Sequence, residues 1–378
     1  MSLEAFVFDD GHRLVAANLG QVYDAWLEAA RQAAALDFVL QIKRQRYNDT
    51  VHEYLYRMTD TDAGRGNSLG RLGPRLAKIH ARHRDMKAQA LAAEAGRHER
   101  LVRECRQYRA LRLGMISSEA AAILRLMDVY GMLGNRFMVV GTNAMAAYEI
   151  EAGARFAFGV DATEDFDLAW SSGKIALSAG IGALSPWLPE RMLELDPADD
   201  LIPLLNSPPG SLRELLKRRD ATYTRNTERP FQVRNASGYE VEVLLARSLA
   251  DQFPRTEQLS PIPLEEQDWL LLGSPVVHVV IGRDAKAARL VVPDPRYFAL
   301  QKLWLAEKPS RTATKRPKDR AQGSTVLAAV RKFMPQYPLD QAFAERLPAS
   351  LKPYLVQWLA QEAEAVAALP GESERRRW

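Results

Sequence analysis

The sequence predicts an α/β chain of the α+β kind, with a mixed-sheet core between an N-terminal helix, β-hairpin and long-helix module and a C-terminal helical bundle. Three observations predict this class. Strand-like and helix-like patterns alternate between residues 136 and 292, long helical segments rich in Ala and Arg precede them, and helical patterns alone follow Pro293. Because 378 residues exceed what one hydrophobic core usually holds, we divide the chain into 1–116, 117–292 and 293–378.

The N-terminal module is predicted from two changes of hydrophobic period. Alternating apolar and polar residues on both sides of the turn pair Asn48-Asp49 indicate a hairpin, and apolar residues at helical spacing flank it. The predicted elements are a helix over 19–36, strands near 38–46 and 51–58, a loop over 61–73, a long helix or helical hairpin over 74–113 interrupted at Gly96, and a helix from Ser117 or Ser118 to about Met132.

The core and the C-terminal bundle follow from the same patterns. The core elements are a strand over 136–140, a turn over 141–143, a helix over 144–152, a strand over 165–170, two or three strands within 222–246, and strands over 276–281 and 287–292 that end a mixed sheet. The bundle has helices over 296–307, 317–333, 338–346 and 349–368, with a polar loop over 309–318 and a basic tail.

Composition excludes several classes of protein. With 47% hydrophobic residues and no apolar run of 18, the sequence predicts a folded, cytoplasmic protein without a membrane partner or signal peptide. The single Cys105 excludes an internal disulfide and Cys-based zinc motifs. Walker and Rossmann glycine motifs are missing from the sequence, and the Gly-x-Ser-x-Gly run 66–70 lies in the predicted polar loop, which argues against a hydrolase elbow.

Residues 43–112 carry a concentration of positive charge. They hold 17 Lys and Arg against 8 Asp and Glu. Clustered cations gain free energy by releasing counterions from phosphates, so the region predicts contact with a nucleic acid, and a solvated helix face is the alternative. Interleaved tyrosines, Tyr47, Tyr54, Tyr56 and Tyr108, favour RNA, such as a tRNA end, as the partner. In the same region we interpret His80 and His83 as solvated side chains.

The residues with the clearest chemistry lie in the predicted core. A strand ends in the turn Gly141-Thr142-Asn143, which opens a helix, and the next strand carries Asp165 and Asp167. Because side chains alternate along a strand, these two carboxylates share one face. Neighbouring carboxylates need a cation between them, and oxygen ligands favour Mg²⁺ or Mn²⁺. Backbone N–H groups at the turn are suited to bind a triphosphate.

This order of motifs resembles the nucleotidyltransferase core shared by polymerase-beta-like enzymes, and is similar to bacterial stand-alone nucleotidyltransferases, among them relatives of abortive-infection toxins. The resemblance implies that Asp165 and Asp167 bind the metals and that a third carboxylate, Glu242 or its neighbour Glu240, completes the metal site. It also implies that Gly141, Thr142 and Asn143 grip the nucleotide, with Lys302 and Lys318 neutralising it. The sequence departs from the family at Thr142, usually Ser, and at Glu242 and Gln322, usually Asp.

The resemblance implies a metal-dependent transfer of a nucleoside monophosphate from a nucleoside triphosphate to an acceptor hydroxyl, with RNA or tRNA as the expected acceptor. Two alternatives stay open. One is a nucleic-acid-binding protein with a degenerate transferase core, and the other is a toxin-type transferase that modifies a protein and has an antitoxin or other protein partner. For Glu240, Glu242, Lys302 and Lys318 the plain alternative is an exposed residue of a strand edge or helix surface.

Overall fold

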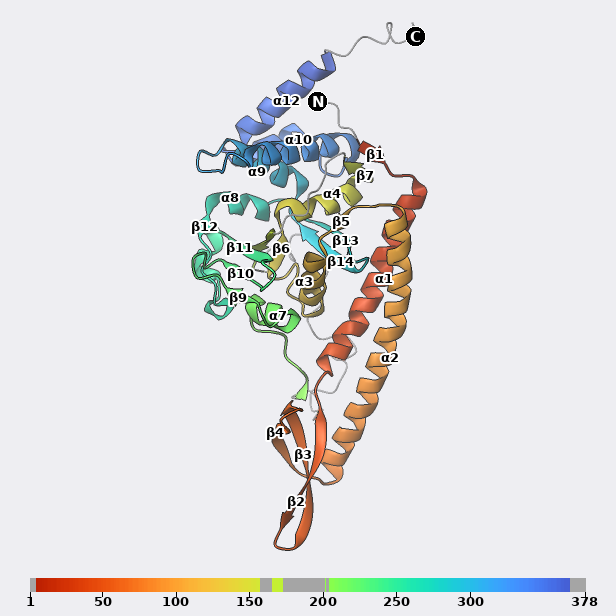
Figure 1. Ribbon diagram of the computed structural model, residues 1–378. Helices are drawn as coiled ribbons and strands as arrows, with labels where there is room; N and C mark the ends of the chain where they lie inside the picture. Colours follow the sequence, from red (N-terminus) through yellow and green to blue (C-terminus); the bar gives the residue numbers. More distant parts are fainter. Residues whose placement is uncertain (1–4, 157–164, 173–200, 202–203, 368–378) are drawn as a thin grey trace.

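The structure, a computed structural model, describes residues 5–156, 165–172, 201 and 204–367. An arm of two long helices and a small sheet extends from one side of an α/β core, and the C-terminal helices lie at the opposite end (Figure 1). The α/β class is therefore confirmed. Side chains from all three predicted segments, such as Leu19, Phe166 and Leu327, belong to one apolar cluster, and the boundaries at 116 and 292 stay predictions.

The arm is built on two helices that lie side by side, α1 (Asp10–Ala35) and α2 (Pro74–Ala110). Helix α1 begins well before the predicted residue 19, because the Asp9 side chain accepts a hydrogen bond from the His12 N–H at 2.9 Å and caps it. Helix α2 continues through Gly96 where an interruption was predicted. Its 37 residues span about 55 Å at 1.5 Å per residue.

Three antiparallel strands form the sheet at the far end of the arm: β2 (Leu40–Tyr47), β3 (Thr50–Asp60) and β4 (Arg65–Arg71). The predicted hairpin is confirmed, and its turn residues Asn48 and Asp49 both have positive φ. The prediction of a loop over 61–73 is wrong for 65–71. Glycines suggested a loop there, but a Cβ at Gly66 would lie 2.7 Å from the Arg57 carbonyl oxygen, so a glycine is what lets the strands pair closely.

One face of this sheet belongs to a second apolar cluster that joins it to the helices. Leu40 and Leu55 pack there with Leu36 and with Ile79 of α2. His83 is also buried here: its ring stacks on Phe38 at 4.1 Å between centroids, and burial lowers its pKa. The interpretation of His83 as a solvated side chain is therefore wrong, because one face of α2 turns inward at this position.

The base of the arm is buried in the main core. Tyr108 is fully buried and donates its hydroxyl to the Gly114 carbonyl at 3.0 Å, so it is not a surface tyrosine of the basic region as we predicted. Cys105 is buried beside it, and burial raises the pKa of its thiol to about 11. Both side chains therefore serve packing at this end of α2.

The core sheet has the order β6-β8-β11-β10-β9. Its strands are β6 (Phe137–Val139), β8 (Asp165–Trp170), β9 (Thr224–Arg225), β10 (Gln232–Arg234) and β11 (Glu240–Ala246), and the short β12 (Pro263–Leu264) pairs with the end of β11. Strand β8 is antiparallel to β6 and parallel to β11, which confirms the predicted mixed sheet. Phe166, Leu168, Val241 and Val243 fill the buried face.

Two further sheets flank the core. Strands β13 (Val276–Gly282) and β14 (Ala287–Val292) pair with each other, and β13 also pairs with β5 (Met115–Ile116), so the three strands form a separate sheet instead of ending the core sheet as predicted. One edge of β13 is occupied by β5 and the other by β14, so β13 has no edge free to join the core sheet. A short pair that the sequence did not predict joins β1 (Ala5–Val7) to β7 (Ala154–Phe156).

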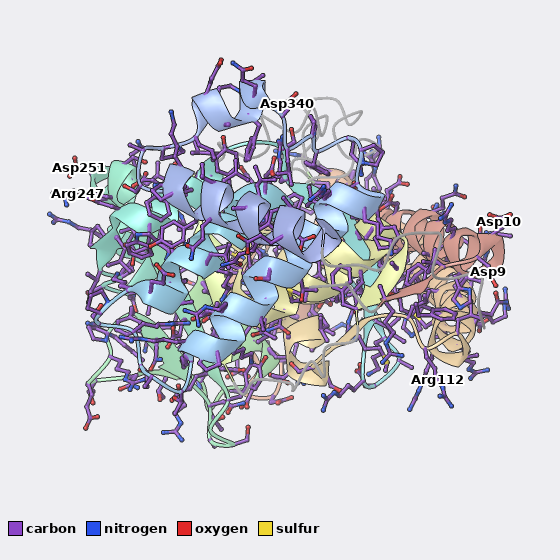
Figure 2. The ribbon with its side chains drawn as sticks, turned by 90° about the horizontal axis from the view of Figure 1, so that it is seen from above. Asp9, Asp10, Arg112, Arg247, Asp251 and Asp340 are labelled. Carbon is purple, nitrogen blue, oxygen red and sulfur yellow. The ribbon has the colours of Figure 1, made fainter. Side chains whose placement is uncertain are left out.

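Helices surround these sheets. They are α3 (Ser118–Val129), α4 (Met145–Ala152), α7 (Leu212–Arg219), α8 (Glu265–Asp268), α9 (Pro295–Glu307), α10 (Arg316–Phe333), α11 (Gln341–Arg346) and α12 (Lys352–Ala367). Seen from above, C-terminal helices cover the core, and Asp9, Asp10 and Arg112 mark the base of the arm at the side opposite Arg247 and Asp251 (Figure 2). Among the described residues, every helix is too short or too polar to cross a bilayer. The predicted basic tail lies outside the described residues.

A buried ionic cluster joins the arm to the core. Asp128 of α3 is fully buried, and its carboxylate accepts a hydrogen bond from Arg289 Nε of β14 at 2.9 Å. Arg31 of α1 donates to the Asp128 backbone carbonyl at 2.7 Å and lies 3.4 Å from its carboxylate. Arg289 also pairs with Asp24 of α1. One carboxylate therefore holds cations from two elements that are far apart in sequence.

Glu149 of α4 makes the stability of the core depend on pH. It is buried, and burial raises the pKa of its carboxyl to about 7, although it accepts a hydrogen bond from the Phe156 N–H at 2.9 Å. The folded state therefore holds this proton longer than the unfolded chain does, and stability falls as pH rises from about 4.5 to about 7.

We expect Glu149→Gln to remove this loss. At pH 8 the free energy of unfolding of the variant should be about 3 kcal/mol higher than that of the unchanged protein. At about pH 4.5 the two free energies of unfolding should be equal. Urea unfolding at both pH values measures the difference. A gain of the same size at both pH values would contradict the assignment, because it would not come from ionisation.

Candidate active site

The site begins at the turn that follows β6. Gly141 opens a short 3₁₀ turn, η1 (Gly141–Ala144), with φ of +72°, a conformation that favours glycine. A Cβ at Gly141 would lie 2.2 Å from Asp167 Oδ2, so any side chain there would displace the Asp167 carboxylate. The Val140 N–H also donates to the Asp167 carbonyl at 3.0 Å. The turn and the Asp-x-Asp strand are therefore in direct contact, as the sequence predicted.

The acidic residues of β8 and β11 lie side by side because the two parallel strands pair in register. Asp167 is opposite Glu242, and Asp165 is opposite Glu240, across neighbouring strands about 4.8 Å apart. Asp167 and Glu242 line one cleft, where Glu242 also accepts a hydrogen bond from Gln232 of β10. Glu240 lies outside the cleft lining and pairs with Arg234 at 3.7 Å. The side chain of Asp165 lies outside the described residues.

The cleft has a volume of about 270 Å³ and lies between the core sheet and helices α8 and α9. Its walls combine the acidic pair with Leu244, Leu264 and Leu270. Gln267 is buried in the wall, and its Oε1 has no hydrogen-bond partner among the described residues. Because buried polar atoms are normally satisfied, this oxygen is suited to accept a hydrogen bond from a ligand.

Opposite the carboxylates the cleft is lined by four cations: Lys302, Lys308, Arg311 and Lys315. Asp319 of α10 holds two of them, with Oδ1 2.9 Å from Lys302 Nζ and Oδ2 2.7 Å from Arg311 Nε. Asp319 and Lys302 are both buried, so the pair is held in one geometry. The plain alternative for Lys302, a surface lysine, is therefore wrong.

Close packing of α10 on α9 brings these groups together. A Cβ at Gly323 would lie 2.7 Å from the Ala299 carbonyl oxygen, so glycine permits the approach. One residue earlier, Gln322 donates through Nε2 to Thr142 Oγ1 at 3.2 Å, which links α10 to the turn. Thr142, its neighbour Asn143 and Lys318 are partly buried and lie outside the cleft lining.

The donor chemistry of the cleft fits a hard divalent cation. Asp167 and Glu242 offer carboxylate oxygens on a rigid sheet, which Mg²⁺ and Mn²⁺ prefer. Within the described part of the chain, three or more Asp, Glu, His or Cys side chains are nowhere grouped as metal ligands. Asp167 and Glu242 therefore offer oxygen ligands of the kind that such a cation prefers, whereas Glu266, a third carboxylate in the cleft lining, pairs with Lys308.

Comparison with known families agrees with this geometry. A family model described as Nucleotidyltransferase matches residues 118–183 and 197–348, together more than half of the chain. The chain belongs to this nucleotidyltransferase family. Its matched residues include the turn, both acidic strands and the cationic wall, and they leave out the arm of this nucleotidyltransferase. Searches of curated proteins and of solved structures gave no match.

Sequence reasoning missed part of the candidate site. Arg311 and Lys315 come from the predicted polar loop over 309–318 and Lys308 directly precedes it, while Asp319 was considered only as the neighbour of Lys318 at a helix start. A signal was present, because residues 308–318 contain five cations and no acidic residue. Such a run between two helices is also typical of a solvated loop, and only the fold shows that it turns back over the cleft.

Proposed function

We propose that this nucleotidyltransferase transfers a nucleoside monophosphate from a nucleoside triphosphate to an acceptor hydroxyl with the help of Mg²⁺. One observation carries the proposal: a single cleft has Asp167 and Glu242 on one side and four cations on the other. Carboxylates are suited to hold a metal, and the cations are suited to hold the polyanionic leaving group. The Lys302–Asp319 pair supports the second role, because it fixes a cation in place before a ligand arrives.

In the proposed reaction the acceptor oxygen attacks the α-phosphorus, a new phosphorus–oxygen bond forms, and the bond to the departing pyrophosphate breaks. Lys302, Lys308 and Arg311 bind and orient the β- and γ-phosphates, and the backbone at Gly141 supports the nucleotide from the other side. Asp167 and Glu242 would hold a Mg²⁺ ion, which would supply charge stabilisation when bound. Glu242, not Glu240, is the proposed third carboxylate, because Glu242 faces the cleft and Glu240 pairs with Arg234.

Nucleotide binding by an Arg311 variant tests the cationic wall. We expect Arg311→Ala to weaken binding of a nucleoside triphosphate about 10-fold, the loss of one charged hydrogen bond. Calorimetry with and without Mg²⁺ measures the change. Arg320→Ala is the matched control, since Arg320 lies on α10 but is exposed and outside the cleft lining. Equal losses in both variants would show general electrostatics instead of a phosphate site.

The reaction itself is tested with each α-labelled nucleoside triphosphate and total RNA or total protein from cells. Labelled RNA is the expected result, and labelled protein would favour the toxin-type alternative. If Mg²⁺ leaves nucleotide binding unchanged and no acceptor becomes labelled, the proposal fails and a nucleic-acid-binding protein with a degenerate core is favoured.

A further inference from the structure

The sheet at the far end of the arm has one face that the described helices leave uncovered. Antiparallel register places Lys43 opposite Tyr54, and Gln45 opposite His52, on the same side of the sheet. Tyr47 and Tyr56 follow on that side by alternation, and Arg71 of β4 is opposite Tyr54. We call this set, Lys43, Tyr47, His52, Tyr54, Tyr56 and Arg71, the tyrosine face. The other side carries Leu40 and Leu55, which pack in the apolar cluster with α2.

The side chains of the tyrosine face are accessible, and Tyr56 is held in place. Tyr47 is 71% exposed, and Tyr54 and Tyr56 are partly exposed. Gln45 donates through Nε2 to the Tyr56 hydroxyl at 2.7 Å, and Lys43 Nζ lies 4.9 Å from the centroid of the Tyr56 ring. These contacts restrain the Tyr56 ring, so less conformational entropy is lost when a flat partner stacks on it.

The charge of this face is positive. Lys43 and Arg71 contribute cations, whereas Glu53 lies on the opposite face and pairs with Arg44 at 2.9 Å. Asp60, at the end of β3, pairs with Arg65 at 3.6 Å. Glu53 and Asp60 are therefore matched by arginines, and the tyrosine face presents aromatic rings between cations.

We propose that the tyrosine face binds a single-stranded segment of nucleic acid. Bases stack on aromatic rings with little sequence preference, and cations beside the rings pair with the phosphates. A protein segment would instead favour an apolar groove, but the exposed side chains here are polar and aromatic. RNA and DNA strands share this chemistry, and the experiment below distinguishes them.

The inference also identifies the acceptor of the transfer as a nucleic acid, and in this respect it rests on the proposed function. The sheet lies at the end of a helix about 55 Å long, away from the core that holds the cleft (Figure 1). An acceptor that reaches both places is a macromolecule. Nucleic acid bound at the tyrosine face would bring its hydroxyl to the cleft from a second contact far from the reaction.

The test measures binding of fluorescent oligonucleotides, each 20 nucleotides long, to the full chain by fluorescence anisotropy, in the absence of nucleoside triphosphate and Mg²⁺. The probes are single-stranded RNA, single-stranded DNA and an RNA duplex. We expect the double variant Tyr47→Leu/Tyr54→Leu to weaken single-strand binding about 30-fold, because two stacking contacts are lost. Leucine keeps the two positions apolar and is compatible with a β-strand. Val51→Ala is the control, since Val51 is 57% exposed on the opposite face of the same hairpin.

A second pair of variants gives an answer even where the tyrosine variant does not fold. Lys43→Gln should weaken binding several-fold, and Arg44→Gln, at the adjacent position on the opposite face, less than twofold. Equal losses for these two variants would overturn the inference. A duplex that binds as tightly as a single strand to both the tyrosine variant and the unchanged protein would overturn it too. So would unchanged protein that binds a nucleoside triphosphate but no oligonucleotide, and that result would leave the proposed function standing.

Discussion

Replacing Asp167 by asparagine is expected to lower the rate of nucleotide transfer by roughly 1,000-fold or more, because several kcal/mol of charge stabilisation are lost at about 1.4 kcal/mol per factor of ten. The substitution keeps the size of the side chain, and the neighbouring Gly141 turn still accommodates it. Transfer of an α-labelled nucleotide measures the rate, and far-UV circular dichroism shows that the fold is retained.

Asp251→Asn is the matched control for this experiment. Asp251 is an exposed carboxylate at the edge of the core, and it undergoes the same chemical change (Figure 2). Its activity should stay within about twofold of the unchanged protein, since exposed substitutions have small effects. Retained transfer in Asp167→Asn would contradict the placement of the reaction at this cleft, whatever the nature of the acceptor.

Replacing Asp128 by alanine is expected to reduce the free energy of unfolding by about 3–5 kcal/mol, because it leaves the buried Arg31 and the partly buried Arg289 without their shared carboxylate. The attraction between these groups is strong because Asp128 and Arg31 are buried and Arg289 is only 12% exposed. Urea unfolding of the full chain, followed by circular dichroism, measures the loss.

Asp24→Ala is the comparison for Asp128. Asp24 also pairs with Arg289, but its side chain is 62% exposed, whereas that of Asp128 is 1% exposed. An exposed pair contributes about 1 kcal/mol or less, so this variant should lose little stability. Similar losses for both variants would show that burial does not decide the strength of this cluster.

The fold was predictable where local patterns decide it. The alternation around Asn48-Asp49 gave the hairpin of the arm, and the Gly141 turn followed by Asp-x-Asp gave the centre of the core sheet. Strand β4 was not predictable, because its glycines are typical of loops and only pairing with β3 explains them. The start of α1 was missed for another reason: its first residues are polar, and the Asp9 cap is a single side chain.

The candidate site was predictable in its acidic half and less so in its basic half. Asp167 could be found because alternation along its strand places it on one face with Asp165 before any tertiary contact is known, and Glu242 was expected from the family resemblance. Alternation could not distinguish Glu242 from Glu240, because the two residues are two positions apart and lie on the same face of their strand. The choice depends on the pairing of Glu240 with Arg234 and on the position of the cleft. The position of Lys302 in the site depends on its contact with Asp319, which forms because α9 and α10 pack against each other, so it could not be predicted from the sequence.

Because α2 is continuous from Pro74 to Ala110, the arm holds the small sheet at a fixed distance from the core. On our proposal that the tyrosine face binds a single strand, a rigid rod of fixed length would set the shortest strand that can occupy this face and still reach the cleft. Seven residues inserted in both α1 and α2 would move the sheet outward by about 10 Å while rotating it by only about 20°. Lengthening the rod in such steps would thus shift the size of substrate that the protein selects, without altering either binding surface.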